Sequence, residues 1–211
     1  MTETDQHQTV QEETREAVQS GFDVHEKVKG ITLKALTERQ LDRENIKNVA
    51  EAVSKGIYEG MTTQSGQAKE VFAHAATALD DSLAAAAEAS KLAIEEAASK
   101  VNEYSRHDLN DATTDLEGME GTFLGTLEQA AKDSNQMVSD IVGDFVSHAR
   151  QSGTAVGKQV LTALEALKEL PHLSKETVIS STVATTISLA QIGSGILSGI
   201  AESLQSSHSK K

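Results

Sequence analysis

Seven histidines are the residues of this chain best suited to metal binding or proton transfer. No two of them stand three or four positions apart, which excludes the zinc motif that places two imidazoles on one helix face. Glu70/His74 and Asp144/His148 are carboxylate and imidazole pairs at i, i+4, where we expect surface ion pairs. A carboxylate-bridged metal centre needs Glu-x-x-His pairs on facing helices, a spacing that this sequence lacks. We therefore predict no metal site.

The run from Ser105 to Asp108 places a hydroxyl, an imidazole and a carboxylate within four residues. Because neighbouring residues at a turn point in different directions and a catalytic triad is a tertiary arrangement, we interpret this run as turn and capping chemistry. The chain has no cysteine, so it has no thiol nucleophile. Its glycines follow no strand and form no phosphate-binding loop. The sequence predicts a protein that is not an enzyme, without catalytic residues, cofactor or small-molecule substrate.

The glycines show a different pattern, in which pairs four residues apart would leave grooves on a helix surface. Another helix backbone can approach closely at such a groove, which favours close helix packing and a homo-oligomer. The alternative is that small residues simply keep the helices thin. The predicted packing pairs are Gly56/Gly60, Gly121/Gly125, Gly153/Gly157 and Gly195/Gly199.

Composition points to helix as the only regular structure. The 211 residues include one proline, four phenylalanines, two tyrosines and no tryptophan. Sandwiches, barrels and open sheets need many turns and many aromatic or β-branched residues, so these classes are excluded. The net charge is −13, and most of the acidic excess lies in residues 56–144. A polyanionic surface repels phosphate, which argues against a nucleic-acid partner.

The apolar spacing predicts an all-α fold, a long antiparallel amphipathic hairpin with a shorter N-terminal helix and an apolar C-terminal helix. We expect a disordered acidic lead-in over residues 1–14, an elongated helical domain over 15–170 and an apolar helix with a short basic tail over 171–211. The N-terminal helix should span about residues 10–38. The two long helices should span about 42–104 and 108–170 and meet at a turn near Ser105. Asp42 should cap the first of them, with Leu41 and Ile46 as a hydrophobic staple.

Both long helices carry an apolar stripe that repeats every eleven residues, which is typical of nearly straight or slightly right-handed packing. The stripe positions are Phe72, Leu83 and Ile94 in the first helix, and Leu116, Leu127, Val138, Ala149 and Val160 in the second.

The segment behind Pro171 is uncharged from residue 177 to residue 201. Apolar side chains cover more than half of its helical circumference, so it is expected to be buried somewhere. Three interpretations stay open: a helix packed on the hairpin, an amphipathic helix on a lipid or polymer surface, and a membrane span. The candidate partner contacts are Val178, Ile179, Val183, Ile187, Ile192, Ile196, Leu197 and Ile200.

Several segments resemble a family of uncharacterised proteobacterial helical proteins over about residues 15–170. That family implies no activity and no site residues. In general character, as a small, cysteine-free, alanine-rich chain of long amphipathic helices, the protein also resembles phasins, which coat polyhydroxyalkanoate granules. The segments that carry the family resemblance are 31–36, 41–44, 84–100, 123–127 and 148–160.

Two functions follow as hypotheses. The first is a non-enzymatic, self-associating helical protein that coats a hydrophobic surface, such as a polyester storage granule or a membrane face, with its acidic faces outward. The alternative is a soluble cytoplasmic scaffold or oligomer in which the C-terminal helix is part of the core. Residues 1–16 lack a signal peptide, so we expect a cytoplasmic location, with peripheral attachment to a granule or the inner membrane face under the first hypothesis.

Overall fold

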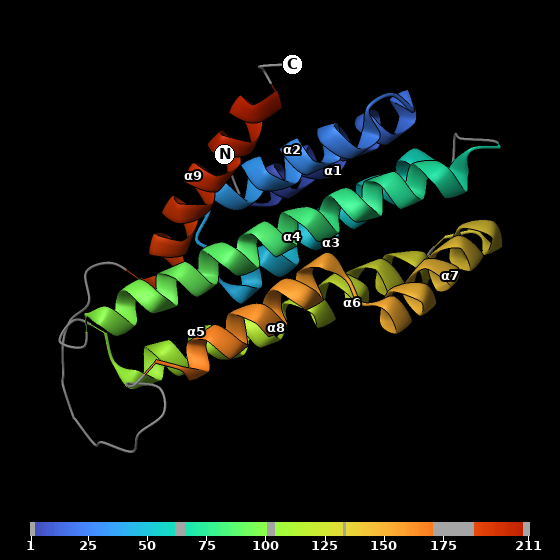
Figure 1. Ribbon diagram of the computed structural model, residues 1–211. Helices are drawn as coiled ribbons and strands as arrows, with labels where there is room; N and C mark the ends of the chain where they lie inside the picture. Colours follow the sequence, from blue (N-terminus) through green and yellow to red (C-terminus); the bar gives the residue numbers. More distant parts are fainter. Residues whose placement is uncertain (1–2, 62–65, 101–103, 133, 171–187, 209–211) are drawn as a thin grey trace.

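The computed structural model describes residues 3–61, 66–100, 104–132, 134–170 and 188–208, and all regular structure in these ranges is α-helical (Figure 1). The predicted all-α class is therefore confirmed. The helices are α1 (Glu3–Ser20), α2 (Val24–Thr37), α3 (Arg43–Met61), α4 (Ala68–Ser99), α5 (Arg106–Glu117), α6 (Met119–Lys132), α7 (Gln136–Ser152), α8 (Ala155–Lys168) and α9 (Leu189–His208).

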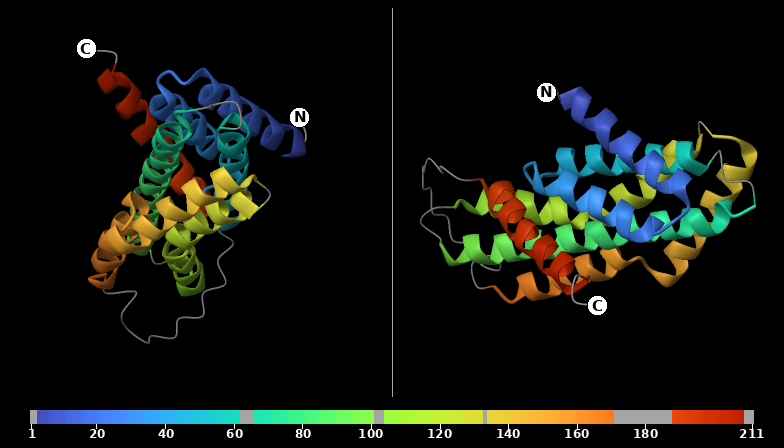
Figure 2. Two further views of the ribbon diagram at one scale, coloured as in Figure 1. Left: turned by 90° about the vertical axis from the view of Figure 1, so that its right-hand side faces the viewer. Right: turned by 90° about the horizontal axis from the view of Figure 1, so that it is seen from above.

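The first eight helices form three stacked antiparallel hairpins: α1 with α2, α3 with α4, and α5–α6 with α7–α8 (Figures 1 and 2). Each hairpin contributes one arm to each of two layers, so that α1, α3 and α6 adjoin in one layer and α2, α4 and α8 adjoin in the other. Arms within a layer run in the same direction. Lys69 of α4 pairs with Asp144 of α7. Eleven residues further along both arms, Asp80 of α4 accepts a hydrogen bond from the Ala155 N–H at the start of α8, so these two arms run in parallel.

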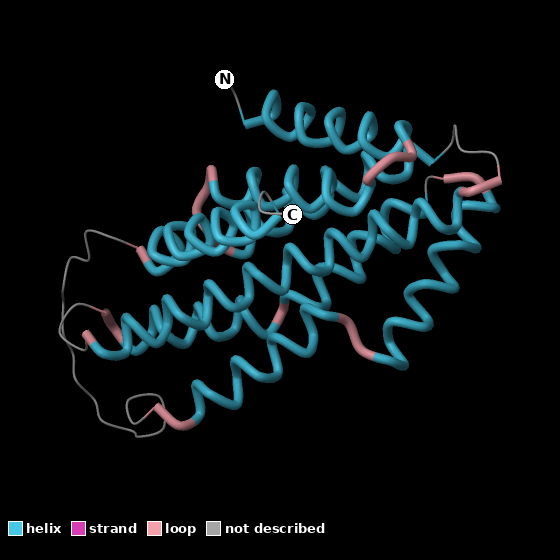
Figure 3. Tube along the Cα trace, turned by 45° about the horizontal axis from the view of Figure 1, so that its top comes forward, coloured by secondary structure: helices cyan, strands magenta, loops and turns pink. Residues whose placement is uncertain are grey.

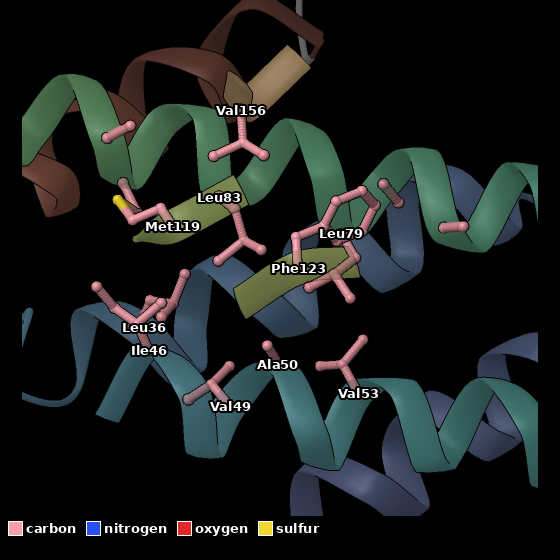
Figure 4. Packing of buried hydrophobic residues seen from close by; sticks show 14 of the residues in the cluster. Leu36, Ile46, Val49, Ala50, Val53, Leu79, Leu83, Met119, Phe123 and Val156 are labelled. Atoms are coloured by element: carbon pink, nitrogen blue, oxygen red, sulfur yellow. The ribbon is translucent and has the colours of Figure 1, made fainter. Parts of the chain in front are cut away.

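Helix α4 lies at the centre of this arrangement and contacts α2, α3, α8 and α9. Alanine fills most of its buried positions, and small side chains allow neighbouring helices to approach closely on several sides. Larger aliphatic and aromatic side chains from α2, α3, α4, α6 and α8 gather between the layers (Figure 4). The labelled core residues are Leu36, Ile46, Val49, Ala50, Val53, Leu79, Leu83, Met119, Phe123 and Val156.

The predicted eleven-residue stripes are confirmed as core positions, because every stripe residue from Phe72 to Val160 is buried. The staple at the start of α3 is confirmed too. Asp42 accepts a hydrogen bond from the Asn45 backbone N–H at 2.9 Å, and Leu41 and Ile46 are both buried. The helical periodicity of the sequence thus correctly located the core face.

The predicted helix lengths are wrong, because turns divide each expected helix (Figure 3). The lead-in expected as disordered is helical from Glu3, and the N-terminal helix reverses at Gly21, which has φ of 62°. The helix expected over 42–104 ends at Met61 and resumes at Ala68. The helix expected over 108–170 is divided into α5, α6, α7 and α8. A stack of three shorter hairpins therefore replaces the single long hairpin.

Within the described part of this chain, another helix approaches closely at one of the four predicted glycine pairs. A Cβ on Gly56 would lie 2.7 Å from the Thr14 Cβ, and one on Gly60 would lie 2.6 Å from the Val18 Cβ, so α1 lies directly on this face of α3. Gly157 faces the Glu120 side chain, not another backbone, and Gly153, with φ of 78°, ends α7. A Cβ added at Gly121, Gly125, Gly195 or Gly199 would have no described heavy atom of another segment within 4 Å.

This difference predicts opposite effects of alanine at two glycines. We expect Gly56→Ala to lower the free energy of unfolding by about 1–3 kcal/mol, because the added methyl group must push α1 away from α3. Gly125→Ala should leave stability unchanged or raise it by up to about 1 kcal/mol, because its surroundings are open and alanine favours helix. Urea unfolding followed by circular dichroism measures both. Equal effects of the two substitutions would contradict the α1–α3 contact.

Candidate functional site: the α9 docking surface

Helix α9 crosses α2 and α4 and packs against both (Figure 1). Gly193 lies at the contact with the body: a Cβ there would be 3.5 Å from the Leu41 Cβ and 3.8 Å from the Ala93 Cβ. Two hydrogen bonds hold the start of α9 to the end of α2 and the linker after it. The Leu41 backbone N–H donates to the Ala190 carbonyl at 3.0 Å, and the Ser194 hydroxyl donates to the Thr37 carbonyl at 3.0 Å.

The docked face of α9 is a stripe of Gly193, Leu197 and Ala201, spaced four residues apart. Leu197 is 0% exposed, so this candidate contact residue packs inside the fold, and a contact with a partner stays a prediction. Burying such a side chain stabilises the fold by about 1.5–3 kcal/mol. The structure therefore places this part of the uncharged segment in the core.

The other predicted contact residues fall into two groups. Ile192, Ile196 and Ile200 are partly buried and pack against the core from the edge of α9. The glycines Gly195 and Gly199 lie on the exposed side of the same helix. Val178, Ile179, Val183 and Ile187 lie outside the described residues.

None of the helices within the described ranges combines the length and the apolar character that a bilayer crossing requires. Part of the uncharged segment, residues 177–187, lies outside those ranges.

A buried carboxylate joins α4 to the start of α8. Asp80 is 8% exposed and accepts hydrogen bonds from the backbone N–H groups of Ala155 at 2.7 Å and Val156 at 2.9 Å. Thr154 caps the same helix by accepting from the Gly157 N–H, and it donates to Glu120 at 2.6 Å. These groups satisfy helix donors that would otherwise be unpaired. The arrangement ties the second hairpin to the third.

The pKa of Asp80 is raised because burial disfavours the charged carboxylate. The hydrogen bonds from Val156 and Ala155 act in the opposite direction, whereas the nearby Asp81 and Glu120 carboxylates raise the pKa further. Sequence analysis missed this group. The Gly153-Thr154 pair is a signal for a helix break and a new cap, but nothing in the local sequence indicates that an aspartate of another hairpin completes that cap.

The residues first considered for metal or acid–base chemistry lie at the surface as separate pairs. Glu70 and His74 are 3.9 Å apart and both exposed, whereas Asp144 pairs with Lys69 instead of His148. Ser105 caps α5 and forms a capping box with Asp108, which confirms the interpretation of this run as capping chemistry. Within the described residues, no three histidine, aspartate or glutamate side chains gather in a group that could hold a metal ion.

Comparison with known proteins gives one match. Residues 1–206 match a family described as a family of unknown function (DUF6781), and the matched range includes most of α9. No curated protein matches the chain. No solved structure matches it either. The resemblance to phasins stays a prediction.

We expect Asp80→Ala to lower the free energy of unfolding by about 2–3 kcal/mol, because two N–H groups at the start of α8 lose a charged acceptor. Asp140→Ala on α7 is the matched control, since Asp140 is exposed and pairs with Gln136 of its own helix. Its effect should stay within about 0.5 kcal/mol. Chemical unfolding at neutral pH measures both, and equal losses would contradict the role of Asp80.

The raised pKa of Asp80 also predicts the sign of a pH effect. The folded protein holds this proton more tightly than the unfolded chain, so the contribution of Asp80 to stability is greatest below about pH 4 and declines as the pH rises through its folded pKa. The difference in free energy of unfolding between wild type and Asp80→Asn should therefore decrease as the pH rises from about 4. A difference that grows with pH would show that the fold favours the charged carboxylate.

Proposed function

We propose that this chain, which belongs to the family of unknown function DUF6781, is a non-enzymatic helical scaffold whose C-terminal helix is part of its folded body. The observation that carries the proposal is the docking of α9, with Leu197 fully buried and Gly193 against Leu41 and Ala93. A scaffold acts through a rigid surface, and α9 completes that surface over α2 and α4.

The competing hypothesis is a coat on a granule or a membrane face. It requires an apolar stripe that is free to meet that surface. The strongest apolar stripe of α9 instead faces α2 and α4, and the stripes of the other helices form the core. Lipid or polymer binding through these stripes would have to expose the core, which costs the free energy of their burial. The geometry therefore supports the scaffold better than the coat.

The outer surface supports a protein partner. Acidic side chains line the outward side of α4, and the net charge of −13 disfavours binding to nucleic acid. A rigid acidic helical surface is suited to a partner chain that carries lysine and arginine. We place this scaffold in the cytoplasm. The acidic residues on this side of α4 include the exposed Glu70 and the half-buried Asp81, Glu88 and Glu95. Asp81 pairs with His25 of α2, and Glu88 and Glu95 pair with Lys91 of α4.

Leu197→Asp tests the position of α9. We expect it to detach α9 and to expose the apolar surface over α4, because a charge cannot occupy the buried site. Hydrogen exchange at the α9 amides should become fast, and light scattering should show aggregation. Gly199→Asp is the matched control, because Gly199 lies on the exposed side of α9 with open surroundings. It should leave exchange and particle size as in wild type.

The two functions are separated by flotation of the intact protein with liposomes and with polyester granules. The scaffold proposal predicts that wild type stays unbound and that its α9 amides remain protected. Flotation of wild type with loss of α9 protection would contradict the proposal and support the coat.

A further inference from the structure

The turn between α1 and α2 presents a phenylalanine to solvent, at the end of the stack where α4 begins (Figure 1). Phe22 is 74% exposed and is the most exposed large apolar side chain within the described ranges. A single exposed apolar residue is ordinary on a protein surface. The inference therefore depends on what holds this ring outward and on what lies beside it.

The backbone and two side chains hold the ring in its exposed position. Gly21 and Asp23, on either side of Phe22, have φ of 62° and 54°, and residues other than glycine rarely adopt such values. The Ser20 hydroxyl accepts a hydrogen bond from the Lys27 ammonium at 3.0 Å. The same ammonium nitrogen lies 5.4 Å from the centre of the Phe22 ring. A ring that is already ordered loses less entropy when it binds a partner.

A pocket of about 390 Å³ lies beside this turn, between the start of α2 and the first turns of α4. Its volume is within the range of about 300–1,000 Å³ for sites that hold small molecules, so it has room for one phenyl ring. Gly21 and Asp23 belong to its wall, whereas Phe22 between them does not. Each molecule therefore carries an exposed ring and a pocket next to each other.

The wall of this pocket has an apolar part and an acidic part. Its apolar surface includes Val24 and Val71, which are buried. A ring that carries a lysine, such as Phe22 with Lys27, matches both parts, because the ring can contact the valines while the ammonium meets the carboxylates. The carboxylates are those of Asp23, Glu26 and Glu70, all of which are exposed.

The pocket stays acidic when its other charged groups are counted. Its wall has three carboxylates, two histidines and no lysine or arginine. His25 lies 2.9 Å from Glu26, and His74 lies 3.9 Å from Glu70. Even with both imidazoles protonated, one negative charge is left over. Residues 62–65, which connect α3 to α4 outside the described ranges, contain no charged residue.

We infer that a second copy of this chain binds at this pocket, in a symmetric dimer in which Phe22 and Lys27 of each copy enter the pocket of the other. Because ring and pocket are adjacent in each molecule, one twofold axis forms both contacts at once. A different protein would have to supply a matching ring and a matching pocket of its own. Helix α9 is not part of the pocket wall, so this inference goes beyond the scaffold proposal and can fail without it.

Sedimentation velocity of the intact protein from about 5 to 500 μM tests the dimer. A contact centred on one turn of each copy is small, so we expect half of the chains to be dimeric at roughly 10–100 μM. Phe22→Ser should raise that concentration at least about tenfold, because the aromatic anchor is lost. Leu161→Ser on α8 is the matched control, since Leu161 is 64% exposed and lies outside the pocket wall. Wild type that stays monomeric at 500 μM, or equal effects of the two substitutions, would overturn the inference and leave the scaffold proposal intact.

A charge reversal tests the acidic part of the contact. Lys27→Glu should weaken the dimer by about tenfold, because it brings a carboxylate to the carboxylates of the other copy. Lys158→Glu on α8 changes the net charge by the same amount at an exposed position and should leave the dimer unchanged. Circular dichroism checks that both variants fold. Equal weakening by the two reversals would show that only net charge matters and would overturn the inference.

Mixing two variants tests the twofold arrangement. Phe22→Ser removes the ring, and His74→Trp places a large side chain in the wall of the pocket. Each variant alone loses both contacts of its dimer. A mixed pair keeps one contact, in which the intact ring of one copy meets the intact pocket of the other. The mixture should therefore dimerise more strongly than either variant alone, and a mixture that dimerises no better would overturn the inference.

Discussion

The fold depends on how closely other helices can approach α4. Alanine occupies most of its buried positions, and Ala75, Ala86 and Ala97, which recur every eleven residues on one face of the helix, are fully buried. A helix with larger side chains on so many sides would hold its neighbours further apart, and the aromatic content of this chain is too low to fill the gaps. The scarcity of aromatic residues is therefore consistent with close packing around one thin central helix.

Two further contacts depend on this central helix. Asp80 of α4 completes the cap of α8 and so fixes the third hairpin against the second. Further along α4, Ala93 leaves the space into which Gly193 of α9 fits. The uncharged C-terminal segment, which by sequence could be a core helix, a surface binder or a membrane span, has its described part on this small-residue surface. That position is the physical basis for the proposal that α9 belongs to the folded body of a scaffold and is not an anchor.

Sequence periodicity predicted which faces are buried but not where the chain reverses. The positions of the eleven-residue stripe, from Phe72 to Val160, were correctly predicted to be buried. The spacing of apolar residues decides which face of a helix is buried, and the sequence gives that spacing directly. The same stripe continues through the breaks at Gly118 and Gly153, so it could not reveal that one expected helix is several. Glycine spacing was also insufficient, because close approach at Gly56 depends on the position of α1, a tertiary property.

The candidate site was predictable only in part. The uncharged composition pointed to the segment behind Pro171, but it could not show that Leu197 is fully buried against the body of the fold. Asp80 carried no local signal, because its partners, the backbone N–H groups of Ala155 and Val156, lie in another hairpin. A buried carboxylate of this kind can be identified only from the three-dimensional structure, which shows both its burial and its hydrogen-bond partners.

The position of α9 on α4 is tested most directly by an engineered disulfide. The natural chain has no cysteine, and a Cβ at position 193 would lie 3.8 Å from the Ala93 Cβ, a separation typical of disulfides. The double variant Ala93→Cys with Gly193→Cys should form an intramolecular cross-link on mild oxidation, whereas Ala93→Cys with Gly199→Cys, on the exposed side of α9, should not. Equal cross-linking of the two pairs, or none in either, would contradict the docking of α9 on α4.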